Sequence, residues 1–263
     1  MRLYSIASGS SGNCIYVGDN DTHILIDVGV SCKRIEAALK ENDLSADRIN
    51  GILITHEHSD HVAGLGVISR RYHIPVYATY ETIMQIQRYS SLGAIDDSLF
   101  RPVFANVDLR IGGLTVHPFS IPHDAANPVA YRISSRDKTV AVATDMGYYN
   151  DYIVDNLKGL DAVLLEANHD IRMLETGSYP YMLKKRILGD KGHLSNEASG
   201  QLLTRILNDK LKYILLGHLS RENNYEELAY ETVRLELAMS GGHAEDIPIK
   251  VAKRDCPTEM LFI

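Results

Sequence analysis

The chain has 263 residues, of which 45% are hydrophobic and 23% charged, and its 27 Lys and Arg against 34 Asp and Glu give a formal net charge of −7. This composition is typical of one globular domain and excludes a disordered or fibrous chain, and its acidic balance does not favour nonspecific coating of nucleic acid or anionic membranes. No apolar run approaches the roughly 20 residues of a membrane span and the start lacks a signal-peptide core, so we expect a single cytoplasmic domain over residues 1–263 with no membrane partner.

Short β-rich runs alternate with helical stretches along the chain, which favours an α/β fold. Strands are predicted at His23–Val28, Gly51–Thr55, Val76–Ala78 and Leu114–His117. Helices are predicted at Ser31–Glu41, Ser195–Asp209 and Tyr225–Met239. A serine is the predicted N-cap of the first two helices, and Asn224 with Glu227 is the predicted capping box of the third.

The chain also contains an internal echo. Residues 23–29 predict a strand that ends in Asp27-Val28-Gly29, and residues 139–147 predict one that ends in Asp145-Met146-Gly147. A helix and a second strand follow each turn: the later helix is predicted at Asp151–Leu157 and its strand at Ala162–Leu165. Such a repeat implies two sheets packed face to face, with helices outside and polar strand ends along one edge. The alternative is coincidence between two ordinary strand–turn–helix units.

Four potential metal ligands lie together in Thr55-His56-Glu57-His58-Ser59-Asp60-His61, where an apolar strand ends. At an extended strand end, positions two apart point to the same side, so His56 and His58 can hold one ion. The chain then turns, so Asp60 and His61 can face a second ion. Imidazole and carboxylate groups suit Zn, Mn or Fe. The alternative, a solvated histidine-rich turn, would leave desolvated polar groups without partners.

Three further ligand candidates stand where apolar runs stop. His123 follows Val116–Ile121, Asp145 ends the second-half strand, and His218 follows Tyr213–Gly217. For each residue alone, a structural histidine or a turn-capping aspartate is the competing interpretation, and the cluster at residues 56–61 favours a metal role for all three. His23, His73, His117 and His243 have no such companions and are predicted to be surface or strand residues.

In order along the chain, these candidates resemble the ligand set of the metallo-β-lactamase superfamily. The resemblance implies its αβ/βα four-layer sandwich and two divalent metal ions. One ion would be held by His56, His58, His123 and Asp145, and the other by Asp60, His61, His218 and the shared Asp145. Asp27 would orient a ligand histidine. Zinc β-lactamases commonly use a cysteine where this chain has Asp145, which disfavours β-lactam hydrolysis.

Other motifs are similar to those of phosphodiesterases in this superfamily. Gly192-His193-Leu194-Ser195 resembles the Gly-His-(Ser/Thr) helix start of ribonuclease Z, and residues 217–221 resemble its final ligand motif with its arginine. Residues 8–14, 166–170 and 218–223 look most like the YycJ-like (WalJ) branch, whose members are regarded as DNA exonucleases. The chain has no long Gly/Pro-rich arm for tRNA and no room for a β-CASP domain, which weakens an RNA assignment.

The chemistry expected from these residues is phosphodiester hydrolysis. Two cations can share a bridging water, lower its pKa to give a hydroxide nucleophile, and stabilise charge on the phosphoryl oxygens. Asp60 would orient this nucleophile as well as ligate. His193 would donate a proton to the leaving alkoxide, and it stands just before a helix N-terminus that favours phosphate. Alternatively, His193 simply caps that helix.

Five residues are predicted to contact substrate. Ser10 and Asn13 belong to a small-residue turn whose amides can form an anion nest, although a plain tight turn is equally compatible. Ser195 opens the helix after His193, and Arg221 follows the last ligand. Lys185 belongs to the basic run Lys184–Lys191, beside tyrosines 179 and 181 that can stack on bases; the competing interpretation is a solvated helix face.

The first functional hypothesis is a dinuclear metal phosphodiesterase that acts as a DNA exonuclease. A phosphodiesterase for cyclic nucleotides or sugar phosphates is the main alternative, favoured by the acidic net charge. A thioester hydrolase of the glyoxalase II type shares the ligand pattern but does not explain residues 192–195. A diiron redox centre lacks an evident flavin segment, and a non-catalytic binding module does not explain an intact ligand set with a proton donor. Metal identity, direction of digestion and oligomeric state stay open.

Overall fold

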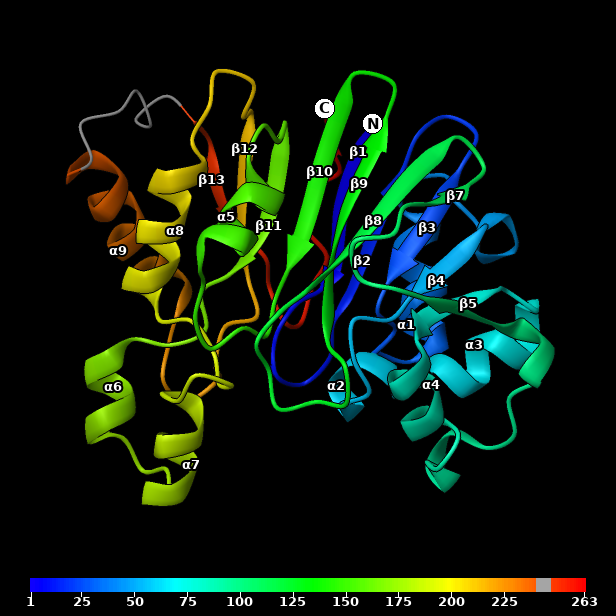
Figure 1. Cartoon of the computed structure of the whole chain (residues 1–263), viewed down its shortest axis with the longest axis horizontal. Helices are drawn as coiled ribbons and strands as arrows, with labels where there is room; N and C mark the ends of the chain where they lie inside the picture. The colour runs from blue at the N-terminus through cyan, green and yellow to red at the C-terminus, as the bar shows by residue number, and fades with distance from the viewer. Residues whose placement is uncertain (240–246) are drawn as a thin grey trace.

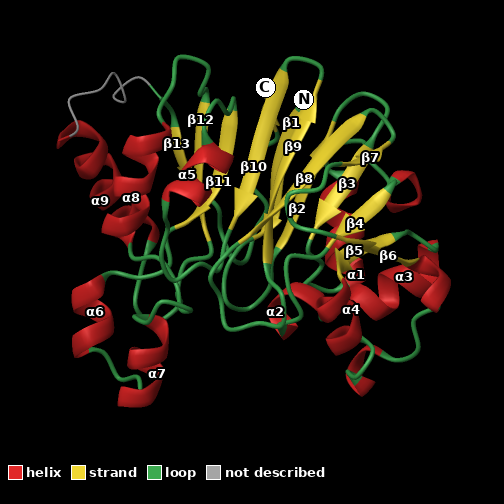
Figure 2. Ribbon diagram, viewed as in Figure 1, coloured by secondary structure: helices red, strands yellow, loops and turns green. Residues whose placement is uncertain are grey.

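A computed structural model describes residues 1–239 and 247–263; His243 lies outside them. Two mixed sheets of seven strands pack face to face, and helices cover the outer face of each sheet (Figures 1 and 2). This arrangement confirms the predicted four-layer α/β sandwich. Within the described ranges, no helix is long and apolar enough to cross a membrane.

The first sheet contains the strands of the N-terminal half together with the C-terminal strand. Its order is β14 (Leu261–Phe262), β1 (Arg2–Ala7), β2 (Cys14–Gly18), β3 (His23–Ile26), β4 (Gly51–Leu53), β5 (Val76–Thr79) and β6 (Phe100–Val103). The strands from β3 to β6 are parallel, so their carboxyl ends share one edge. Helices of this half are α1 (Cys32–Lys40), α2 (Ser59–Val62), α3 (Leu65–Tyr72) and α4 (Tyr80–Ile86).

The second sheet repeats this plan with the later strands. Its order is β13 (Ile249–Val251), β12 (Tyr213–Gly217), β11 (Ala162–Glu166), β10 (Lys138–Ala143), β9 (Val129–Ser135), β8 (Leu114–Ser120) and β7 (Leu109–Ile111). The strands from β10 to β13 are parallel. Helices of this half are α5 (Asp151–Leu157), α6 (Ile171–Thr176), α7 (Tyr181–Ile187), α8 (Asn196–Ile206) and α9 (Glu226–Met239). The pair α6 and α7 lies beyond the carboxyl edge, at the lower left of Figure 1.

The apolar runs of the parallel strands are continuous because both faces of each sheet are covered. In β3, Ile24 and Ile26 join the core between the sheets, whereas Leu25 packs under the helices. In β12, Leu215 faces the other sheet, whereas Leu216 faces its own helices. Each sheet therefore packs against the other sheet on one face and against its own helices on the other. The polar residues at the strand ends lie at the carboxyl edge.

The two Asp-x-Gly turns adopt the same backbone shape, which supports the predicted repeat. Asp27 after β3 and Asp145 after β10 have φ of 58° and 63°, in the left-handed region that non-glycine residues seldom occupy. A Cβ on Gly29 would lie 1.7 Å from the backbone oxygen of Asp60, and one on Gly147 would lie 2.4 Å from the backbone of Asp190. Both glycines thus permit a close approach of two chain segments at the edge that carries the aspartates.

Two predicted helix ends differ from the structure. Ser31 and Ser195 are the N-caps of α1 and α8, as predicted, but α8 ends at Ile206 because Leu207 has an extended ψ of 138°. The capping box at Asn224 is wrong. The Asn224 Oδ1 instead accepts from the backbone of Tyr225 at 3.0 Å and from the Asn196 side chain at 3.1 Å, and no hydrogen bond joins Asn224 to Glu227 in the described part of the chain.

Candidate metal centre

The predicted metal ligands converge at the carboxyl edge of the sandwich. His56 follows β4 in the first sheet, whereas His123, Asp145 and His218 follow β8, β10 and β12 in the second. Because β8 is antiparallel to β9 and β9 is antiparallel to β10, β8 ends at the same edge as β10. The facing sheets thus bring residues more than 150 positions apart into one cluster.

The described residues form four overlapping groups of possible metal ligands, of which one joins Asp145, Glu166, His193 and His218 and one joins His56, His61 and Asp145. The other two groups have three donors each and match the predicted sets. In each group the ligand atoms lie within 4.8 Å of one another: His56, His58 and His123 form one group, and Asp60, His61 and His218 form the other. Asp145 lies beside both, with Oδ2 at 3.3 Å from His61 Nε2 and 2.9 Å from His218 Nδ1, and Oδ1 at 3.9 Å from His123 Nε2. The structure therefore brings together all seven residues predicted as ligands.

The state of His56 tests whether this cluster fits a metal. The ring is fully buried, and its Nε2 has no hydrogen-bond partner among the described residues. Burial, reinforced by the nearby His61, holds the pKa of His56 well below its usual range, so the ring is neutral with a free lone pair. A buried polar atom without a partner is costly, and a divalent cation would satisfy it. The donor set therefore fits a metal ion.

Asp27 orients one of the ligand rings. Its Oδ2 lies 2.8 Å from His61 Nδ1, and its Oδ1 accepts a 2.8 Å hydrogen bond from the backbone of Thr55. These contacts direct His61 Nε2 toward Asp60 and Asp145. A carboxylate behind a ligand imidazole fixes the ring orientation and raises its basicity. Asp27 has a left-handed backbone conformation, and its side chain points to His61.

The carboxylates dominate the electrostatics of the cluster. Burial opposes a charge on His218, but Asp145, with help from Glu166 and Asp60, raises the pKa of this imidazole to about 9. Burial likewise opposes a charge on His61, and Asp145 and Asp27 nevertheless raise its pKa well above the usual value. A site with this much negative potential favours cations, and cation binding must displace protons from these two rings.

His193 lies beside the cluster and is held by Glu166, a contact that was not predicted from the sequence. Its Nδ1 lies 2.7 Å from Glu166 Oε1, and the other Glu166 oxygen accepts a 3.0 Å hydrogen bond from the backbone of Met146. Glu166 is fully buried at the end of β11. Ser195, not His193, caps α8. The signal for this role was an acidic residue that ends an otherwise apolar strand, Ala-Val-Leu-Leu-Glu.

Three buried asparagines join the loops that carry His193 and His218. The contacts among them were not predicted from the sequence either. Asn224 donates to the side-chain oxygen of Asn196 at 2.8 Å, and Asn168 donates to the backbone oxygen of His218 at 2.9 Å. Asn196 begins α8, and Asn168 follows Glu166. Each of the three side chains is at most 6% exposed, so their hydrogen bonds are shielded from water and hold the loops in fixed positions.

Comparisons with known proteins identify the family. The Beta-lactamase superfamily domain matches residues 22–214. The chain is 39% identical to Exodeoxyribonuclease YycJ of Bacillus anthracis, with 100% of this chain and 99% of the relative covered. It is 41% identical to Exodeoxyribonuclease WalJ of Streptococcus pneumoniae serotype 2, with 90% and 88% covered. The chain belongs to the metallo-β-lactamase superfamily. It is a hydrolase of that superfamily, similar to these two exodeoxyribonucleases.

A solved structure shares the fold of the whole chain. Human tRNase Z, short form (ELAC1), superposes with a TM-score of 0.66 at 14% identity, with 98% of this chain and 99% of that chain covered. At this identity the likeness concerns the fold of the superfamily. The resemblance to the YycJ and WalJ branch is confirmed by the two relatives above, and the likeness to human tRNase Z is one of fold.

Within this metallo-β-lactamase fold, Asn13 is the predicted substrate residue that touches the cluster. Its Nδ2 lies 3.1 Å from His61 Nε2, and its Oδ1 accepts from the backbone of Gly9 at 2.9 Å. Ser10, in the same turn, is exposed. The Ser195 hydroxyl accepts from the backbone of Ala198, so it serves the helix cap.

Arg221 and Lys185 lie outside the cluster. Arg221 is exposed in the loop after His218, and Lys185 is exposed on α7. The neighbouring Arg186 pairs with Asp124 through a 2.9 Å contact, which joins α7 to the loop that carries His123. The basic run is therefore partly structural, with Lys185 left exposed beside the metal-cluster loop.

Proposed function

We propose that this chain is a dinuclear metal-dependent phosphodiesterase that acts as a DNA exonuclease. The observation that carries the proposal is the juxtaposition of two three-donor groups, their shared Asp145 and the Glu166-supported His193. The DNA substrate is inferred from the exodeoxyribonuclease names of relatives that are 39% and 41% identical. The substrate agrees with the cytoplasmic location that the sequence predicts, which stays a prediction.

The two donor groups would each hold one divalent cation, Zn, Mn or Fe, with Asp145 between them. When bound, the cations would supply the Lewis acidity that activates water and neutralises charge on the phosphoryl oxygens. Asp60 would orient the attacking water. Its side chain is 22% exposed, more than those of the buried ligands around it, so its free carboxylate edge can reach the solvent side of the cluster.

His193 would deliver the proton that the leaving alkoxide needs. The Glu166 carboxylate accepts from Nδ1, which leaves Nε2 as the proton-transfer atom. The imidazole side chain is 14% exposed, so it can contact a substrate that enters from solvent. Its Nδ1 lies 3.6 Å from Asp145 Oδ1, which places the ring beside both donor groups. Glu166 thus acts as a positioning residue for His193.

Substrate contacts would come from the loops around the cluster. Lys185 on α7 and Arg221 after His218 are exposed cations on this edge and suit backbone phosphates. Tyr181, which is 75% exposed on α7, can stack on a base. Ser10 and Asn13 belong to the turn next to His61, where the Ser10 amide and the Asn13 side chain would contact a phosphate.

The proposal is tested with purified protein that is stripped of metal and reloaded with Mn or Zn. End-labelled duplex and single-stranded DNA are the substrates, and an Asp145→Ala variant is the control. Release of labelled mononucleotides by the wild type and not by the variant supports the exonuclease. Cleavage of bis-p-nitrophenyl phosphate while DNA survives would instead identify a small-molecule phosphodiesterase, which the acidic net charge of −7 favours.

A further inference from the structure

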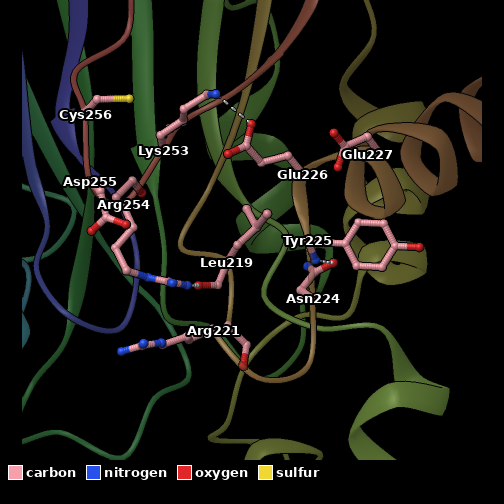
Figure 3. A pocket seen from close by; sticks show the side chains of 13 residues that line it. Leu219, Arg221, Asn224, Tyr225, Glu226, Glu227, Lys253, Arg254, Asp255 and Cys256 are labelled. Atoms are coloured by element: carbon pink, nitrogen blue, oxygen red, sulfur yellow. Dashed lines mark hydrogen bonds and ion pairs between the residues drawn. The ribbon is translucent and has the colours of Figure 1, made fainter.

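A pocket of about 420 Å³ lies next to the metal centre (Figure 3). It is bounded by the loop after β12, the start of α9 and the segment after β13. Its polar lining includes Ser8, Ser220, Arg221, Asn224, Lys253 and Arg254. The volume falls within the range of about 300–1,000 Å³ that is usual for small-ligand sites. Neither the metal ligands nor the proton donor belongs to this lining.

The pocket is coupled to the metal centre by two hydrogen bonds. Ser8 lines the pocket, and its hydroxyl accepts a 2.8 Å bond from the backbone nitrogen of His218. Arg254 donates from Nη2 to the backbone oxygen of Leu219 at 3.0 Å. The pocket wall thus begins one residue after a predicted metal ligand. A phosphate in the pocket would therefore lie close to a phosphodiester at the cluster.

Two guanidinium groups leave free donors in this pocket. Arg254 donates from Nη2 to Leu219, and its Nη1 forms no hydrogen bond or ion pair within residues 1–239 and 247–263. Arg221 is exposed and likewise forms no hydrogen bond or ion pair in the described part of the chain. In Figure 3 the guanidinium group of Arg254 points to Leu219, and that of Arg221 lies below it in the view and points the other way. A planar fork of N–H donors matches the oxygens of a phosphate.

Acidic residues also line the pocket, and they do not neutralise these arginines. Glu226 pairs with Lys253 at 3.2 Å, and Figure 3 places Glu226 and Glu227 on the side away from the guanidinium groups. Asp255 lies beside Arg254 in Figure 3, is exposed, and forms no ion pair with Arg221 or Arg254. Two arginines and one carboxylate thus stand on this side of the pocket, Glu226 and Glu227 stand toward α9, and an anion would bind on the side of Arg221.

We propose that Arg221 and Arg254 bind the terminal phosphate of a DNA strand while the next phosphodiester lies at the metal centre. This inference rests on the proposed nuclease function and explains why hydrolysis would start at a strand end. The Lys253–Glu226 pair joins the segment after β13 to α9 across the far side of the pocket, which opposes a continuous strand. A terminal phosphate also carries about −1.5 to −2 charges at pH 7, which two guanidinium groups match better than one diester charge.

The test compares duplexes that differ only in phosphorylation of one end, with the 5′ end and the 3′ end examined in turn. The readout is the ratio of kcat/KM for phosphorylated over hydroxyl ends, since changes at the metal centre common to both substrates cancel. We expect the wild type to prefer a phosphorylated end by about tenfold and Arg221→Gln or Arg254→Gln to bring the ratio near one. Arg205→Gln is the matched control, because Arg205 pairs with Asp151 away from the pocket.

A binding measurement separates this inference from the proposed function. Fluorescence anisotropy with the metal-loaded full chain uses duplexes whose terminal linkages are nuclease-resistant phosphorothioates. A preference for the phosphorylated end that Arg254→Gln removes supports the pocket even if no DNA is hydrolysed, and in that case the proposed function fails alone. Hydrolysis without an end-phosphate preference, or a preference that survives both substitutions, overturns the pocket and leaves the exonuclease standing.

Discussion

Glu166 Oε1 lies 2.7 Å from His193 Nδ1, inside a loop arrangement that buries the carboxylate completely. The second Glu166 oxygen is held by the backbone of Met146, next to Asp145. One carboxylate therefore links the predicted proton donor to the turn that carries the shared metal ligand. This link fixes the imidazole beside the metal donors without a direct bond from the metal ligands themselves.

The first prediction concerns proton donation by His193. We expect His193→Ala to lower DNA hydrolysis by about 10²- to 10⁴-fold, and Glu166→Gln to lower it by about tenfold. Both variants should lose far less activity on bis-p-nitrophenyl phosphate, because a nitrophenolate leaving group needs no proton. Steady-state rates on the two substrates check this. Glu175→Gln, an exposed change on α6, is the matched control. Equal losses on both substrates would contradict proton donation.

The second prediction concerns metal number. Because two donor groups flank Asp145, we expect elemental analysis to find about two divalent ions per chain, and chelation to abolish phosphodiesterase activity and to lower Tm. His58→Ala should remove one ion, since His58 belongs to the first group only. His117→Ala, far from the cluster on β8, is the control. One ion in the wild type would contradict the dinuclear proposal.

The third prediction concerns the support of His61 by Asp27. Replacing the carboxylate in Asp27→Asn weakens the 2.8 Å contact with His61 Nδ1, so we expect metal affinity to fall by about 10- to 100-fold. Competition with a chromophoric chelator measures this. Asp43→Asn is a matched control, because Asp43 is exposed and has the same left-handed backbone, with φ of 54°. If Asp43→Asn lowered the metal affinity equally, the effect would come from the change at a left-handed position and not from the lost contact with His61.

The sequence predicted the features that depend on short-range patterns. Apolar runs that stop at His56, His123, Asp145 and His218 indicate strand ends, and parallel strands place such ends at one edge. The role of Glu166 could not be predicted in this way. Its partner His193 is 27 residues away, and the helices α6 and α7 lie between them in the chain. The backbone of Leu194 and the hydroxyl of Ser199 on α8 also bond Glu166, so long-range contacts bring the two side chains together.

The wrong capping box at Asn224 has a similar cause. An Asn followed three residues later by Glu satisfies the local rule for a helix start, but the Asn224 oxygen accepts from the backbone of Tyr225 and from the buried Asn196 amide instead. The pocket beside the metal centre was also invisible to local patterns, since Arg254 meets Leu219 across 35 residues. Long-range partners therefore decide which of two locally reasonable roles a polar side chain takes.

The fourth prediction concerns stability at acid pH and the buried His169. Both ring nitrogens lack partners among the described residues, and burial lowers the pKa of His169 to about 4. The unfolded chain has a histidine pKa of about 6.5, so between these values unfolding takes up a proton. The contribution of neutral His169 to stability is therefore fully present above pH 6.5 and is lost as the pH falls toward 4.

Urea unfolding of the wild type and of His169→Phe at pH 7 and pH 5 measures this contribution. The metal ligands also titrate, but their effect is common to both proteins and cancels in the difference. We expect the wild type to lose about 2 kcal/mol more than the variant between pH 7 and pH 5. His73→Phe is the control, because His73 is exposed at the end of α3 and should leave the pH dependence unchanged. Equal losses in the wild type and in His169→Phe would mean that the pKa of His169 is not lowered in the folded protein.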